Sequence, residues 1–340
     1  MSGTTSSGTT SGTTRTRLRR TALLAGAAAL LLAACGSGGP ATPAATGTGA
    51  AGGKVDQVKV GIIPIVDVAP IYLGTKQGFF AKRNIELTLE SGQGGAAIVP
   101  GVVSGQFQFG FSNVTSLLLA ESKGLPLKVV VNGVASTGVQ GKDFGGVVVK
   151  TDSPVRSAKD LAGKTVAVNT LKNIGDTTVR ASVRKDGGNP DAVKFVEMAF
   201  PDMPAAVAGG RVDAAWVVEP LLSIARGQGD RVVAWNYVDA APDLTVATYF
   251  TSAKLAQTNP DLVARFVAAM KESLQYADAN PDQARQVLTT YTKIDQKTVQ
   301  ALTLPKWPVD INRASVQTLA DLAVKDGLLT SAPDLGKLLP

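Results

Sequence analysis

From Val58 onward, short runs of β-branched and apolar residues alternate with stretches of helical composition. Strands that alternate with helices form βαβ units, which build mainly parallel sheets with flanking helices. The pattern occurs twice before residue 250, so we expect an α/β protein with two lobes. The predicted strands are 58–63, 85–89, 107–111, 127–131, 146–149, 165–168, 193–196, 214–218, 231–234 and 245–250.

After residue 250 the sequence is almost wholly helical. Leu262, Phe266, Met270 and Leu274 recur at helical spacing, as expected for one buried face. We expect these C-terminal helices to pack on lobe 1, which we predict to comprise 57–146 plus 246–340, with lobe 2 at 147–245. The earlier predicted helices are 69–77, 96–103, 114–122, 157–161, 177–185, 203–208 and 219–226.

The N-terminal segment has the pattern of an export signal. Four arginines within 15–20 precede an apolar run, 22–34, and small residues lead to Cys35. A cysteine at the cut site resembles a bacterial lipoprotein signal, which implies that residues 1–34 are removed and that Cys35 carries a lipid. The alternative is a transmembrane helix, but the apolar run of 13 residues is shorter than the ~20 that a span needs. Two adjacent arginines leave general and twin-arginine export as alternatives.

A tether follows the predicted lipid site. Residues 36–56 are nearly all Gly, Ala, Ser, Thr and Pro, which cannot bury enough apolar surface to fold. With Cys35 this predicts a disordered segment, 35–56, that reaches about 25 Å. The expected location is the extracytoplasmic face of the cell membrane, through the lipid anchor.

Composition removes several classes of function. The chain has 34 Lys+Arg and 27 Asp+Glu, and four of the arginines lie in the predicted signal, so no basic cluster argues for nucleic acid. Histidine is absent and Cys35 is the single cysteine, which excludes His-dependent nucleophiles and His-ligated zinc. We expect no catalytic residues, no metal and no cofactor.

Small polar and glycine-rich loops follow the predicted strands of both lobes. Ligands of open α/β sheets bind beyond the carboxyl ends of strands, where such residues orient them. The alternative is that these residues are ordinary caps and turns. The run 92–95 lacks the spacing of a phosphate or dinucleotide loop.

An ordered series of short motifs spans most of the chain after the tether: Val60-Gly61-Ile62, 67–73, Gly78-Phe79-Phe80, Ser104-Gly105, Phe109-Gly110-Phe111, 160–167, 210–216 and Glu219-Pro220. The series resembles the bacterial transport-binding proteins for sulfonates, taurine, nitrate and thiamine pyrimidines.

The resemblance implies a type II periplasmic-binding-protein fold whose lobes close on a small molecule and then dock on an ABC permease. It implies hinges near 144–149 and 243–248, and a monomer is the simple expectation. The ligand-binding residues that it implies are Asp67, Ala69, Gln93, Gly94, Ser112, Asn113, Thr137, Asn169, Thr170, Asn173 and Glu219.

The charges of these loops bear on the ligand. The family suggests a sulfonate, nitrate or taurine, yet Lys172 is the one cation in the loops. Two carboxylates, Asp67 and Glu219, suit an amine, amidine or pyrimidine-like donor instead. The alternative is that both carboxylates act at the starts of helices. Trp216 has the pattern of a packing residue.

Two other functions stay open at this point. The resembling family includes thiamine-pyrimidine synthases, which consume a histidine that this chain lacks, so the enzyme alternative is a hydrolase built on Asp67 and Glu219. The second is a sensory or interaction lipoprotein without transport.

Overall fold

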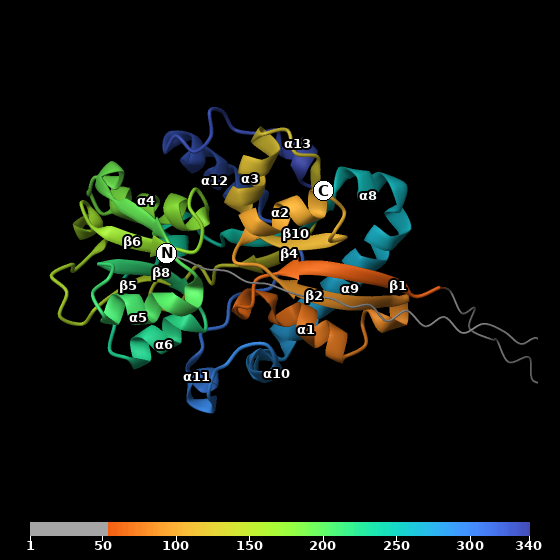
Figure 1. Ribbon diagram of the computed structural model, residues 1–340, viewed down its shortest axis with the longest axis horizontal. Coiled ribbons are helices and arrows are strands. Elements are labelled where there is room, and N and C mark those ends of the chain that lie inside the picture. Colours follow the sequence, from red (N-terminus) through yellow and green to blue (C-terminus); the bar gives the residue numbers. More distant parts are fainter. Residues whose placement is uncertain (1–53) are drawn as a thin grey trace, which may run out of the picture. The chain divides into compact units, whose positions relative to one another are not determined.

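Two five-stranded sheets organise the part of the chain that the computed structural model describes, residues 54–340 (Figure 1). The described residues lie within one compact unit. The predicted signal peptide, the predicted lipidation site Cys35 and all but the last three residues of the predicted tether lie outside the described residues. No helix among residues 54–340 is both long and apolar enough to cross a membrane.

The first sheet defines lobe 1. β1 pairs in parallel with β2 and β3, whereas β10 is antiparallel to both β3 and β4, so four strands run one way and β10 runs the other. The strand order is β2 (Ile85–Ser91), β1 (Asp56–Ile62), β3 (Phe109–Asn113), β10 (Thr245–Ser252) and β4 (Leu127–Ala135).

The second sheet defines lobe 2 and repeats this scheme. β6 pairs in parallel with β7 and β8, and β5 is antiparallel to β8 and β9. The prediction of a two-lobed α/β fold with mainly parallel strands is confirmed, with one reversed strand in each mixed sheet. The strand order is β7 (Lys194–Glu197), β6 (Thr165–Val168), β8 (Ala214–Val218), β5 (Gly145–Val149) and β9 (Arg231–Ala234).

The central strands are buried on both faces, which explains their continuous apolar runs. All five residues of β5 and of β8 are buried. A side chain at Gly145 would lie 2.5 Å from the Tyr237 ring, so this glycine allows the ring to pack on β5.

The helices of lobe 1 cover its sheet, and the C-terminal helices pack on this lobe as predicted. α9 packs on α1 and β4, and its Phe266 stacks on Phe109 of β3 with ring centroids 3.8 Å apart. α11 and α12 also contact α6 and α4 of lobe 2. The elements are η1 (Val66–Val68), α1 (Ala69–Lys76), η2 (Ala81–Arg83), α2 (Gly95–Val103), α3 (Val114–Ser122), α8 (Ala253–Thr258), α9 (Pro260–Ala279), α10 (Pro281–Val287), η6 (Leu288–Thr290), α11 (Gln296–Ala301), α12 (Arg313–Lys325) and α13 (Leu335–Leu338).

Lobe 2 shows where local prediction was wrong by a few residues. The helix predicted from residue 177 begins at Ile174, because the Asn173 side chain accepts a hydrogen bond from the Gly175 amide and caps it. The helix predicted at 157–161 is a 3-10 turn. The elements are η3 (Ala158–Leu161), α4 (Ile174–Lys185), η4 (Pro190–Ala192), η5 (Phe200–Asp202), α5 (Met203–Ala208), α6 (Leu221–Gly227) and α7 (Asn236–Ala240).

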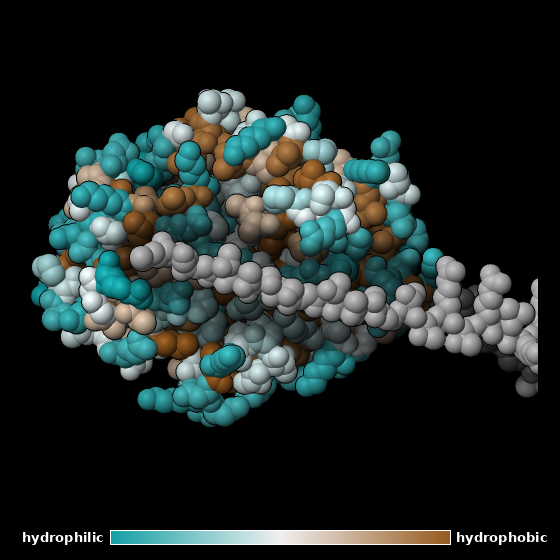
Figure 2. Space-filling view, in the orientation of Figure 1, coloured by the Kyte–Doolittle hydropathy of each residue, from teal (hydrophilic) through white to brown (hydrophobic). Residues whose placement is uncertain are grey.

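Two chain segments connect the lobes, one from β4 to β5 and one from α7 to β10. In the first, the buried Asp143 carboxylate accepts hydrogen bonds from Ser136 Oγ at 2.7 Å and from the backbone amides of Thr137 and Phe144 at 3.0 Å. These bonds fix the path of the connection. On the face shown in Figure 2, hydrophilic residues are spread over both lobes.

Candidate functional site

A small cavity lies between the two lobes, at the ends of strands from both sheets. Its volume is about 20 Å³, enough for about one water molecule. Among its lining residues Asp67 is the single charged side chain. The lining residues are Ile63, Ile65, Asp67, Phe111, Asn113, Asn169, Ile174, Phe200, Trp216, Val218, Tyr237, Val246 and Ala247. We call this space the inner cavity.

Asp67 of lobe 1 provides the one carboxyl group that lines the inner cavity. It lies in η1, just after β1, and is 3% exposed. Its Oδ1 atom is buried without a hydrogen-bond partner. Burial raises the pKa of Asp67 from 3.8 to about 7, and the nearby charge of Asp143 adds to the shift. The carboxylate is therefore ready to accept a hydrogen bond from a donor that enters the cavity.

Lobe 2 contributes an aromatic wall. The Trp216 ring is tilted against Phe200 at 5.3 Å and meets Tyr237 edge-on at 6.1 Å. Nε1 of Trp216 makes no hydrogen bond of ordinary geometry. Trp216, for which the sequence favoured packing over ligand stacking, lines the cavity as well. Aromatic faces of this kind favour a flat ligand.

Two asparagines complete the polar lining. Asn113 caps α3, and its Oδ1 accepts a hydrogen bond from the Ser116 amide at 2.9 Å. Asn169 of lobe 2 donates from Nδ2 to the carbonyl of Gln93 in lobe 1 at 3.1 Å. The Asn169–Gln93 bond joins the lobes across the mouth of the site.

Gly94 lies at the same junction. A Cβ atom at this position would lie 2.8 Å from Thr170 Cγ2 and 2.9 Å from Asn169 Nδ2. The lobes can thus approach this closely because residue 94 has no side chain. Behind them, Asn173 donates to Asn169 Oδ1 at 2.7 Å and to Thr170 Oγ1 at 2.8 Å, which holds the lobe 2 loop.

Eight of the eleven predicted residues do not line the inner cavity, and four of these lie at the lobe junction just described: Gln93, Gly94, Thr170 and Asn173. The other four lie elsewhere. Ala69 is buried in the first turn of α1, and Ser112 is buried under Gly95. Thr137 bonds within the β4–β5 connection, to the Lys142 carbonyl and to Asp143. Glu219 is the fourth. Lys172 is exposed, so the one cation of the predicted loops does not enter the cavity.

Glu219 lies on the lobe boundary in a network of its own. Its carboxylate accepts hydrogen bonds from Ser223 Oγ at 2.8 Å, the Ser223 amide at 3.0 Å and the Thr303 amide at 3.1 Å. Its carbonyl accepts a bond from the Val66 amide. Burial raises the pKa of Glu219 from 4.5 to about 7, against the opposing effect of these donors. The residue ties β8 and α6 to the C-terminal segment.

A second cavity adjoins the first. It has a volume of about 260 Å³ and shares Ile63, Ile65 and Phe200 with the inner cavity. Its other lining residues are Pro64, Ser91, Gly92, Gln93, Ala199, Pro201 and Leu221. We call this space the outer cavity.

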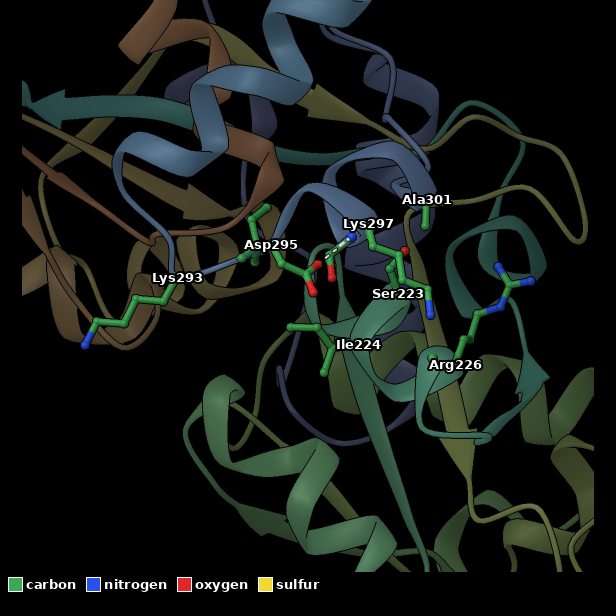
Figure 3. A pocket seen from close by; sticks show the side chains of 10 residues that line it. Ser223, Ile224, Arg226, Lys293, Asp295, Lys297 and Ala301 are labelled. Carbon is green, nitrogen blue, oxygen red and sulfur yellow. Dashed lines mark hydrogen bonds between the residues drawn. The ribbon is translucent and has the colours of Figure 1, made fainter.

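A third cavity, of about 650 Å³, lies between α6 and the segment 293–301 (Figure 3). The side chains of Lys293 and Arg226 extend in different directions around it. Although it is larger, it has no converging set of buried polar groups, so the inner cavity is the better candidate site.

The prediction from strand ends did not include the aromatic and aliphatic residues that line the inner cavity. Phe200 of η5 and Tyr237 of α7 each lie three residues after the end of a strand, but the rule was applied to small polar residues and so passed over aromatic side chains. One signal was present: Trp216 and Val218 alternate with Val217, so they share one face of β8.

Solved structures show the same two-lobed architecture. The alkanesulfonate-binding protein SsuA from Xanthomonas axonopodis pv. citri, bound to MOPS, superposes with a TM-score of 0.72 at 16% identity, over 85% of this chain and 100% of its own. The likeness shows the fold, and the predicted type II periplasmic-binding-protein fold is confirmed.

The family follows from the sequence. Residues 65–284 match the protein family described as NMT1/THI5 like, and the chain belongs to this family. The riboflavin-binding protein RibY of Chloroflexus aurantiacus is 29% identical over 75% of this chain and 73% of its own length. The formylaminopyrimidine-binding protein of Halalkalibacterium halodurans is 22% identical over 65% of each chain. Both relatives are named as binding proteins. Membership of the family makes this chain the solute-binding component of an ABC importer for a small ligand rather than an enzyme, in agreement with the prediction.

Proposed function

We propose that this chain captures a planar nitrogen heterocycle between its lobes and delivers it to an ABC permease. The observation that carries the proposal is the buried Asp67 carboxyl, whose Oδ1 lacks a partner beside the aromatic wall of Phe200, Trp216 and Tyr237. A ring stacked on this wall would present its N–H groups to Asp67.

The charge of the site supports this ligand class over a small anion. No Lys or Arg is among the residues that line the inner or outer cavity. A sulfonate or nitrate in this buried site would find no cation to balance its charge, and it would disfavour the ionised form of Asp67 still further. A neutral or cationic ring with N–H donors meets no such penalty.

The names of two relatives support the same class. RibY is named for riboflavin and the second relative for formylaminopyrimidine. Both compounds contain a six-membered ring with two nitrogens and hydrogen-bonding groups on its edge. By this reasoning Asp67, Asn113 and Asn169 are the polar contacts of the ligand.

Ligand capture requires movement of the lobes. A cavity of about 20 Å³ is smaller than a single heteroaromatic ring, so the lobes must separate to admit one. The connections at 136–144 and 241–244 are the proposed hinges. A ligand that contacts both lobes would shift the population toward a closed form that the permease recognises.

The N-terminal segment completes the proposal. Cys35 would carry a lipid that holds the protein at the extracytoplasmic face of the membrane, near its permease. A Cys35→Ala protein should leave the membrane fraction and still bind ligand. Loss of both properties together would refute this division of roles.

Binding can be tested by calorimetry on the chain without residues 1–34. The panel is riboflavin, 4-amino-5-(formylaminomethyl)-2-methylpyrimidine, taurine, methanesulfonate and nitrate. We expect binding by at least one heterocycle, with affinity reduced at least tenfold in Asp67→Asn and little changed in the surface control Asp310→Asn. Binding of an anion alone, or of none of the five, would refute the proposal.

A further inference from the structure

The inner and outer cavities are separated by three apolar side chains. Ile63 and Ile65 come from the segment after β1 in lobe 1, and Phe200 comes from η5 in lobe 2. Each of the three lines both cavities. One layer of side chains, contributed by both lobes, therefore divides a single interlobe space into two.

The outer cavity differs from the inner one in character. Pro64, Ala199, Pro201 and Leu221 give it apolar walls, and no charged residue lines it. Its 260 Å³ exceeds the inner volume of about 20 Å³ many times over. Burial of apolar surface in this space is favourable, whereas a charged group would lose its water without meeting an opposite charge; Ser91 and Gln93 are the polar side chains of the lining.

The division between the cavities depends on the lobes being close together. Phe200 is 5% exposed and packs on Trp216 from the lobe 2 side, while both isoleucines belong to lobe 1. Separation of the lobes would move Phe200 away from Ile63 and Ile65. The two cavities would then form one elongated site with Asp67 at one end and Leu221 at the other.

We infer that the outer cavity is a second subsite, which holds an apolar edge of the same ligand whose N–H groups meet Asp67. This inference rests on the proposed function and narrows its ligand class. The ligand is a fused planar heterocycle with hydrogen-bonding groups on one edge and hydrocarbon on the opposite edge. A bare pyrimidine would fill only the inner part.

A pair of probes isolates the apolar edge. Alloxazine and 7,8-dimethylalloxazine share the same N–H groups and differ by two methyl groups on the far edge. Two buried methyl groups correspond to about tenfold in affinity. We expect calorimetry at pH 7.5 to show that the dimethyl compound binds about tenfold more tightly to the unaltered protein.

Variants at Leu221 assign that difference to the outer cavity. Leu221 is partly exposed and lines the outer cavity but not the inner one, so its replacement leaves the lining of the inner cavity intact. In Leu221→Asn the tenfold ratio should fall to threefold or less, because the two methyl groups lose part of their apolar wall. The ratio should persist in Leu221→Met, which keeps the wall apolar, and in Leu255→Asn, a partly buried leucine of α8 outside both cavities.

Each outcome decides the question. Equal binding of the two probes, a ratio that persists in Leu221→Asn, or binding of the formylaminopyrimidine without binding of any fused heterocycle would overturn the second subsite and leave the proposed function standing. Failure of both alloxazines and of every heterocycle in the panel would overturn the proposed function together with this inference.

Discussion

Replacement of Asp67 by asparagine should make the protein more stable at neutral and alkaline pH. Burial raises the pKa of this carboxyl from 3.8 to about 7, so the folded state favours its neutral form. At 1.36 kcal/mol per pKa unit, the shift corresponds to about 4 kcal/mol. The stability that the protonated Asp67 contributes to the folded state is fully present below pH 3.8, where the carboxyl is protonated in the folded and the unfolded chain alike. It is lost as the pH rises through about 7, where the folded chain releases the proton.

The measurement is urea unfolding of the unaltered protein and of Asp67→Asn between pH 5 and pH 8. The unaltered protein should lose about 3 kcal/mol over this range through Asp67 alone, at about 1.4 kcal/mol per pH unit below pH 7. The amide cannot ionise, so the variant lacks this loss. The free energies of unfolding should therefore diverge as the pH rises, with the variant more stable at pH 8.

Other buried carboxyls enter both proteins alike. Burial also raises the pKa of Glu219 and of Asp176, to about 7 and about 6, and these contributions cancel in the difference between the two proteins. Asp143 couples to Asp67 through charge, so its own titration should shift slightly in the variant. Parallel pH profiles for the two proteins would show that Asp67 is not held in a medium that disfavours its charge, and the argument for an unpartnered buried acceptor would fail.

Three further predictions concern closure, the lobe boundary and the core. Gly94→Val should weaken ligand affinity at least tenfold, because the valine side chain would collide with lobe 2 and hinder closure. X-ray scattering of the variant saturated with ligand should give a larger radius of gyration than that of the unaltered protein. The control Gly227→Ala, which has open space around the added side chain, should change neither quantity. Ser223→Ala should lower the free energy of unfolding by about 1–2 kcal/mol at pH 8 and by less at pH 5, where Glu219 is protonated, as urea titrations can show. Phe266→Ala should cost about 3–5 kcal/mol in the same assay, since the ring is fully buried against Phe109; a loss below 1 kcal/mol would contradict that packing.

The fold was predictable because its signals are local. Short segments of neighbouring residues are enough to indicate a strand such as Thr165–Val168 or the buried face of α9. The direction of each strand within its sheet was harder to predict. No local pattern near Thr245 indicates that β10 inserts between β3 and β4 and runs antiparallel to both. That arrangement depends on pairing across more than a hundred residues of chain.

The candidate site divides in the same way. Asp67, Asn113 and Asn169 follow strands, and the rule that ligands gather at strand ends was enough to select them. Phe200 and Tyr237 also follow strands, but the rule looked for small polar residues, and an aromatic side chain after a strand is as often a core residue as a ligand contact. Glu219 also follows a strand, yet its carboxylate bonds to Thr303, a partner 84 residues away that no local pattern indicates.

The position of β10 has a consequence for the order in which the chain can fold. All five strands of the lobe 2 sheet, β5 to β9, are consecutive in the sequence, so they are synthesised one after another with no strand of lobe 1 between them. Lobe 1 has a gap between β3 and β4 until Thr245–Ser252 arrives, and Thr245 then pairs with Ala135 at the point where the chain left the sheet. The later lobe in the sequence can thus form its sheet first. Lobe 1, with Asp67 in it, is finished last, so a chain truncated before β10 would hold a complete lobe 2 beside an unfinished partner.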